Sequence, residues 1–265
     1  LTSNSILIGA EFDKVMSILV VSFILALATL RARGLLIRAV AKTQETKSLS
    51  RFFSKDLAQH ITERECDAAI GDVIARDASI LNVDIRGFTP LTHHSTPKEQ
   101  IELITQYHAR IVPIISEFQG HVDKFTGDGI MAYFGVLKEA KDHGVHALKA
   151  MEKIIEASDL WNVERRKNGL EDVVIHASCA SGSIVFGVIG EAHRLEYTVI
   201  GDAANVSAKM EKQTKIEGVR AITTYDTLKS ALENGYMDAV KKWEVRKDRQ
   251  IAGVDHLIDV AVLKE

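Results

Sequence analysis

Two aspartates, Asp84 and Asp128, lie where the sequence favours metal or phosphate chemistry. Asp84 ends an apolar run, residues 79–84, that is typical of a buried strand. Asp128 lies in the T-G-D-G turn of a predicted β-hairpin. Either aspartate alone is more typical of a strand end or a turn. Their significance depends on whether the fold brings them together.

The order of the predicted elements places these two aspartates side by side. We predict an α/β (α+β) domain with a ferredoxin-like β-α-β-β-α-β palm core. The expected strands and helices, in chain order, are 79–84, 97–118, 121–125, 130–134, 140–167, 173–188, 195–200 and 203–214. In this topology the first and third strands are antiparallel neighbours. Asp84 and Asp128, 44 residues apart, should therefore meet at one edge of the sheet.

The residues around this pair indicate a metal–polyphosphate site. Two close carboxylates repel each other unless a cation lies between them. Mg²⁺ commonly binds one or two carboxylates together with substrate phosphates. Directly after Asp84, the turn at Gly87 would let the backbone N–H groups of Gly87, Phe88 and Thr89 point at an anion. We expect these three residues to bind substrate.

Three segments in this order and spacing resemble the class III nucleotidyl cyclase catalytic domain. They are V-D-I-R-G-F-T (83–89), D-K-F-T-G-D-G-I-M-A-Y-F-G (123–135) and R-L-E-Y-T-V-I-G-D-A-A-N-V-S-A-K-M-E (194–211). The resemblance covers residues 79–265. It implies an adenylate cyclase that converts ATP to cyclic AMP and pyrophosphate, uses two Mg²⁺ (or Mn²⁺) ions, and has its active sites at the interface of a head-to-tail homodimer.

The resemblance also assigns metal and purine contacts. Asp84 and Asp128 match the metal-binding aspartates, and the backbone carbonyl of Ile85 is a further ligand. Lys124 matches the lysine that contacts adenine. Thr198 occupies the second purine position, where many relatives have aspartate. Threonine there is typical of a subgroup with bicarbonate-responsive members. The pair of Lys124 and Thr198 favours ATP over GTP.

The third motif carries two expected catalytic residues. Asn205 matches an asparagine that orients the ribose, and Lys209 occupies the place of an arginine that stabilises the transition-state phosphate. Lysine keeps the charge of arginine but loses its planar fork, so turnover is expected to be lower. Relatives often carry a further phosphate-contacting lysine near the end of the domain. In the tail 241–255 we assign that role to no residue.

An apolar segment near the N-terminus predicts a membrane anchor. Residues 15–30 carry no charge, and Lys14 and Arg31 flank them. A helix of 16 residues spans about 24 Å, and snorkelling of the flanking cations would supply the rest of a bilayer core. A buried core helix or a signal peptide would share this composition. We expect an N-terminal segment, 1–31, with one transmembrane helix.

The segment that follows is basic and is expected to be helical. Residues 31–64 contain eight basic residues against three acidic ones. By the positive-inside rule this bias places the catalytic domain in the cytoplasm. We therefore predict a helical juxtamembrane linker over 32–78 and the catalytic domain over 79–265. The chain begins with Leu, which indicates a fragment or a processed product.

The overall composition excludes other classes of protein. The chain of 265 residues carries 33 Lys and Arg against 36 Asp and Glu, a near-balance that argues against a nucleic-acid partner. Apolar residues make up 46% and charged residues 26%, as in globular proteins. The two cysteines, Cys66 and Cys179, exclude a disulfide framework and a cysteine-rich zinc site.

Two alternatives to an adenylate cyclase are open from the sequence. A diguanylate cyclase shares the palm topology and an acidic hairpin turn, but its G-G-D/E-E-F signature differs from T-G-D-G-I here, and a guanylate cyclase shares the family. A non-catalytic, cyclase-like module that binds nucleotide is compatible with Lys209 and with the unassigned tail lysine. Retention of Asp84, Asp128, Lys124 and Asn205 argues against such a module.

Overall fold

The computed structural model describes residues 14–33, 73–93, 95–191 and 194–264. They belong to two units, an N-terminal helix and a folded domain. Most of the expected helical linker, with Cys66, lies outside the described residues. Cys179 is buried in the domain and is not in a disulfide.

The N-terminal helix is long and apolar enough to cross a membrane. It runs over Lys14–Arg33, 20 residues, with a mean hydropathy of 2.2 over its most apolar window. At 1.5 Å per residue its length is about 30 Å, the thickness of a bilayer hydrocarbon core. The helix thus extends beyond the apolar segment 15–30 at both ends.

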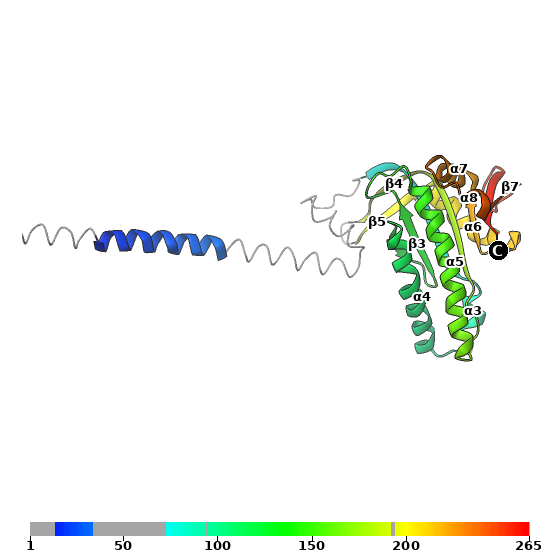
Figure 1. Cartoon of the computed structure of the whole chain (residues 1–265), viewed down its shortest axis with the longest axis horizontal. Helices are drawn as coiled ribbons and strands as arrows, with labels where there is room; N and C mark the ends of the chain where they lie inside the picture. Colours follow the sequence, from blue (N-terminus) through cyan, green and yellow to red (C-terminus); the bar gives the residue numbers. More distant parts are fainter. Residues whose placement is uncertain (1–13, 34–72, 94, 192–193, 265) are drawn as a thin grey trace, which may run out of the picture. The chain divides into compact units, whose positions relative to one another are not determined.

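The domain is built on one eight-stranded sheet (Figure 1). The strand order is β2-β3-β1-β4-β6-β8-β7, and β5 pairs with β4. The strands are β1 (Val73–Ile85), β2 (His121–Phe125), β3 (Gly129–Phe134), β4 (Ile175–Glu191), β5 (Arg194–Gly201), β6 (Ala221–Thr224), β7 (Trp243–Arg249) and β8 (Ile258–Leu263). The helices are α3 (Phe88–Leu91), α4 (Pro97–Glu117), α5 (His143–Lys167), α6 (Asp202–Glu217), α7 (Tyr225–Glu233) and α8 (Ala239–Lys242).

The strands and helices from β1 to β4 form the predicted ferredoxin-like unit. Strand β1 lies between β3 and β4 and is antiparallel to both. One boundary differs from the prediction. Strand β1 begins at Val73, so residues 73–78, assigned to the helical linker from the sequence, are strand. They pair with residues 182–187 of β4, and this pairing overrides the charged Arg76 and Asp77 that interrupt the apolar pattern.

The two faces of β1 contact different helices. Val83 and Ile85 point into the main core, where Tyr107 of α4 donates a hydrogen bond to the Val83 carbonyl at 3.0 Å. Because neighbouring strand residues point to opposite faces, Asn82 and Asp84 face the other way. The Nδ2 atom of Asn82 donates to Oγ of Ser207 on α6 at 2.8 Å. Asp84 therefore lies on the face of the sheet that α6 covers.

A buried carboxylate joins α5 to the C-terminal part of the domain. The side chain of Glu152 is only 13% exposed and accepts hydrogen bonds from three donors. They are the Tyr236 hydroxyl at 2.7 Å, the Lys242 ammonium at 2.6 Å and the Trp243 indole N–H at 2.8 Å. Since each partner lies at least 84 positions away in sequence, Glu152 holds together segments that only the tertiary fold brings near.

Candidate active site

The sheet register brings the two aspartates together as predicted. Asp84 lies directly opposite Gly129, the residue after Asp128. The pKa of the Asp84 carboxyl is raised to about 7, mainly because the side chain is buried and then because Glu211 and Asp128 lie nearby. Acidic side chains are therefore concentrated in a poorly solvated environment where β1 ends and β3 begins.

A hard cation fits this pair. The Oδ1 atom of Asp84 is buried and has no hydrogen-bond partner among the described residues. A buried carboxylate oxygen without a donor is costly, and a bound cation would satisfy it. Among the described residues, there is no group of three or more His, Cys, Asp or Glu side chains that could bind a metal ion by themselves. A Mg²⁺ ion held here would complete its shell with phosphate oxygens and water.

Glu211 is a neighbour of this pair to which the sequence analysis assigned no role. It lies on α6, one turn beyond Ser207, the partner of Asn82. Burial and the nearby Asp128 raise the pKa of the Glu211 carboxyl. The i, i+4 spacing from Ser207 was visible in the sequence, but nothing there indicated that this face of α6 covers β1.

The turn after Asp84 has the conformation that was expected. Gly87 adopts a left-handed conformation with φ of 68° and is the N-cap of the short helix α3. Phe88 and Thr89 occupy the first turn of α3, so their N–H groups have no partner within the helix. Ile85 ends β1 with its side chain buried. Because the side chain is apolar and buried, only the backbone carbonyl of Ile85 could bind a metal.

The two expected purine contacts are in direct contact with each other. The Nζ atom of Lys124 on β2 donates to Oγ1 of Thr198 on β5 at 2.9 Å and to a carboxylate oxygen of Glu196 at 2.9 Å. The Thr198 hydroxyl in turn donates to Oδ2 of Asp123 at 3.2 Å. The sequence analysis gave Asp123 and Glu196 no role, although Asp123 directly precedes Lys124 and Glu196 lies two positions before Thr198.

Helix α6 carries the two expected catalytic residues on one face. Asn205 is exposed near its start, and Lys209 follows one turn later. The Lys209 ammonium donates to the carbonyl of Gly253 in the loop between β7 and β8. Gly201 is the N-cap of this helix, and a Cβ atom there would lie 2.9 Å from the Ser183 carbonyl, so its close contact with β4 requires glycine.

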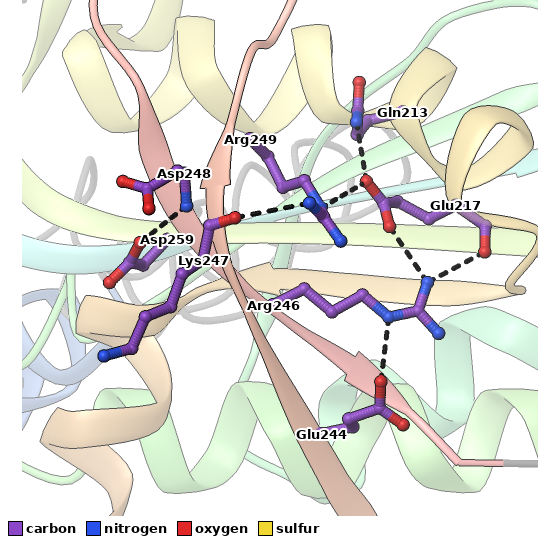
Figure 2. A network of polar contacts seen from close by, with 8 residues as sticks. All are labelled: Gln213, Glu217, Glu244, Arg246, Lys247, Asp248, Arg249 and Asp259. Atoms are coloured by element: carbon purple, nitrogen blue, oxygen red, sulfur yellow. Dashed lines mark hydrogen bonds and ion pairs between the residues drawn. The ribbon is translucent and has the colours of Figure 1, made fainter.

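The other end of α6 is held by ion pairs to strand β7, which pairs with β8 (Figure 2). Glu217 accepts a hydrogen bond from Arg246 at 2.9 Å and pairs with Arg249 at 3.0 Å, both from β7. Gln213 donates to the same carboxylate at 2.9 Å. These contacts fix the position of the helix that presents Asn205 and Lys209.

Lys247 lies between the two arginines, at an irregularity of β7. The pairing register of β7 with β8 shifts between Arg246 and Arg249, and Asp248 adopts a positive φ of 55°. Figure 2 shows the Lys247 side chain directed away from the Glu217 network. The phosphate-contacting lysine of the tail stays unassigned.

Within one chain, the described contacts define two groups of residues. Asp84, Asp128 and Glu211 form an acidic group at the edge of β1 and β3. Lys124 and Thr198 form a second group with Asp123 and Glu196, between β2 and β5.

Comparison with known proteins identifies the family. Residues 74–256 match the adenylate and guanylate cyclase catalytic domain. The chain therefore belongs to the family of class III nucleotidyl cyclase catalytic domains, as the three motifs indicated.

Individual relatives include cyclases of both nucleotide types. The chain is 31% identical over 162 residues to an adenylate cyclase of Anabaena cylindrica, a match that covers 61% of this chain and 32% of the relative. The crystal structure of the guanylyl cyclase Cya2 superposes with a TM-score of 0.63 at 25% identity, covering 72% of this chain and 92% of that one. A bacterial light-regulated adenylyl cyclase superposes with a TM-score of 0.70 at 22% identity, covering 86% and 63%. The chain spans about a third or less of the length of the first curated relatives it matches.

Proposed function

We propose that this chain is an adenylate cyclase that converts ATP to 3′,5′-cyclic AMP and pyrophosphate. In this reaction the ribose 3′-oxygen attacks the α-phosphorus, the bond to pyrophosphate breaks, and the 3′-hydroxyl loses its proton. The observation that carries the proposal is the direct contact of Lys124 with Thr198, which places a donor and a hydroxyl side by side. The family includes both adenylate and guanylate cyclases, and the proposal specifies ATP as the substrate.

The purine contacts follow from simple donor and acceptor chemistry. The Lys124 ammonium has only donors, so it suits the N1 acceptor of adenine. The Thr198 hydroxyl can accept from the exocyclic amino group of adenine, a donor that guanine replaces with an acceptor. Asn205 on α6 would bind the ribose, and Lys209 would offset charge on the reacting phosphate.

The acidic group would hold the metal ions. Asp84 and Asp128 provide the carboxylates, with the Ile85 carbonyl as a third oxygen. Two Mg²⁺ or Mn²⁺ ions, when bound, lower the pKa of the attacking hydroxyl and neutralise charge on the leaving pyrophosphate. The N–H groups of Phe88 and Thr89, at the start of α3, would contact the phosphates.

We further propose that the active sites lie between two copies of the chain. The acidic group and the group around Lys124 and Thr198 are two sets of contacts in each copy, and a head-to-tail dimer would bring one set from each copy to a common substrate. A closed two-fold dimer is the commonest symmetric assembly. Each dimer would then contain two equivalent sites.

The same proposal places the catalytic domain at the cytoplasmic face of a membrane. The Lys14–Arg33 helix has the length of a bilayer span, and the segment that follows it is rich in basic residues. The chain would then comprise an anchor, a linker and the catalytic domain. Tethering would also raise the local concentration of the domains and favour their dimerisation.

A second candidate, a non-catalytic nucleotide-binding module, is favoured by one observation. The Lys209 ammonium is bonded to the Gly253 carbonyl, so its charge is partly engaged within the chain. In this alternative the protein would bind nucleotide without turnover.

A product assay separates these functions. The 265-residue chain, in detergent or in nanodiscs, is incubated with ATP or GTP and Mn²⁺, and both cyclic products are quantified. Cyclic AMP formation with a higher kcat/KM for ATP supports the proposal. A clear GTP preference overturns the substrate assignment, and nucleotide binding without product supports the non-catalytic module.

A further inference from the structure

Asp123 is a buried carboxylate next to the purine-binding pair. Its side chain is 1% exposed, although it lies on the short strand β2 directly before Lys124. One carboxylate oxygen lies 3.5 Å from the Lys124 ammonium and 3.2 Å from the Thr198 hydroxyl. A buried carboxylate is retained at low cost only when it is paired and hydrogen-bonded, as here.

The chemistry of the three groups fixes the direction of each hydrogen bond. A lysine ammonium can only donate, and an ionised carboxylate can only accept. The Thr198 hydroxyl therefore accepts from Lys124 at 2.9 Å and gives its single hydrogen to Asp123 at 3.2 Å. One lone pair of the hydroxyl oxygen is left, so the group Thr198 can offer to a ligand is an acceptor.

This orientation matters because the purines differ at that point. Adenine carries an amino group at position 6, which donates, whereas guanine carries an oxygen, which accepts. A freely rotating threonine hydroxyl would serve either base, since it can donate or accept. A hydroxyl whose hydrogen is committed to a buried carboxylate serves adenine alone.

We propose that Asp123 is a positioning residue that makes the site selective for adenine by orienting the Thr198 hydroxyl. The inference rests on the proposed function, because it takes Lys124 and Thr198 as the purine contacts. It adds that the threonine is selective only through its contact with Asp123.

The test is the ratio of kcat/KM for ATP to that for GTP, measured on the 265-residue chain. In Asp123→Asn the amide can donate to Thr198, which frees the hydroxyl hydrogen for the guanine oxygen. The ratio is expected to fall about tenfold, the effect of one hydrogen bond. Damage to folding or to the metal site lowers both rates and leaves the ratio unchanged.

Two further variants show whether Asp123 acts through Thr198. In a Thr198→Val background, Asp123→Asn is expected to change the ratio less than about twofold, because the hydroxyl it orients is gone. Glu196→Gln is the matched control. Glu196 also pairs with Lys124, but the Thr198 hydroxyl bonds to Lys124 and Asp123. It should leave the ratio near that of the parent.

The outcomes separate the inference from the function on which it rests. A parent that prefers GTP overturns the adenylate cyclase assignment and the inference with it. A parent that prefers ATP, with an unchanged ratio in Asp123→Asn or an equal fall in the Thr198→Val background, overturns the inference alone. Should Asp123→Asn fail to fold, the ratio is measured in Thr198→Val alone, which removes the oriented acceptor and leaves Asp123 in place. The inference expects the ratio to fall about tenfold, because ATP loses an acceptor while GTP is relieved of one that opposes its 6-oxo group. An unchanged ratio, as expected for a freely rotating hydroxyl that serves both bases, overturns it.

Discussion

The Nζ atom of Lys124 lies 2.9 Å from Oγ1 of Thr198, although 74 positions separate the two residues in sequence. The contact exists because β2, which pairs with β3, and β5, which pairs with β4, lie against each other. It brings two residues from separate motifs into one polar cluster, in which Asp123 and Glu196 are the charged neighbours of Lys124.

Loss of Asp84 is expected to abolish turnover without unfolding the domain. Asp84→Ala should lower cyclic nucleotide formation more than about 100-fold and weaken Mn²⁺ binding, measured by isothermal titration calorimetry. Without metal, the melting temperature should equal or exceed that of the parent, because the variant no longer buries an unpartnered carboxylate oxygen. Asp172→Ala, which removes an exposed aspartate paired with Arg166, is the control for both measurements. Near-normal activity in Asp84→Ala would exclude the metal-binding role.

Lys209 is expected to act on the reacting phosphate. Lys209→Ala should lower kcat by roughly 10- to 1000-fold, the range for loss of one charge-stabilising donor, while Lys209→Arg should retain or raise it. Lys215→Ala removes an exposed lysine from the same helix and should leave kcat unchanged. If Lys209→Ala turns over like the parent, the Gly253 contact is the whole role of this lysine.

The shared-site dimer predicts complementation between inactive variants. In the proposed dimer one copy supplies the acidic group, and the other supplies Asn205 together with Lys124 and Thr198. Asp84→Ala and Asn205→Ala therefore damage opposite halves of a site, so in a mixed dimer one site collects both lesions and the other collects neither. Co-expression should restore about one quarter of the parent activity, since half of the dimers are mixed and each has one intact site. The control pair, Asp84→Ala with Asp128→Ala, damages the same group and should restore nothing. Absence of restoration in the first pair, with mixed dimers shown to form, would place the site within one chain.

Glu152 is expected to stabilise the domain without a role in catalysis. Glu152→Ala leaves the Tyr236 hydroxyl, the Lys242 ammonium and the Trp243 indole N–H without their acceptor. The free energy of unfolding should fall by about 3 kcal/mol, mainly because the buried Tyr236 and Trp243 donors lose their acceptor, whereas the half-exposed Lys242 contributes little. Urea denaturation followed by tryptophan fluorescence measures this change. Glu156→Ala, one turn later on α5 in an exposed pair with Lys153, should cost less than about 0.5 kcal/mol.

Local patterns in the sequence were sufficient for the core elements. The helix expected over 97–118 is α4, Pro97–Glu117, and its start is marked by Thr96 and Glu99, which form a capping box. The hairpin around Asp128 follows from strand propensity and glycines at the turn, and the β-α-β-β-α-β order placed Asp84 beside it. The family followed from three motifs at their spacing. All of these signals depend on residues that are near in sequence or on a known order of elements.

Contacts between distant segments were decided only by the tertiary structure. The pairing of residues 73–78 with β4 was hidden by charged residues, since strand pairing depends on a partner that local composition does not reveal. Glu211 approaches Asp128 because α6 packs on β1, and Asp123 orients Thr198 because β2 meets β5. The sequence predicted which side chains carry the chemistry. The packing of strands and helices determined which atoms those side chains contact, and thereby their charge and hydrogen-bond direction.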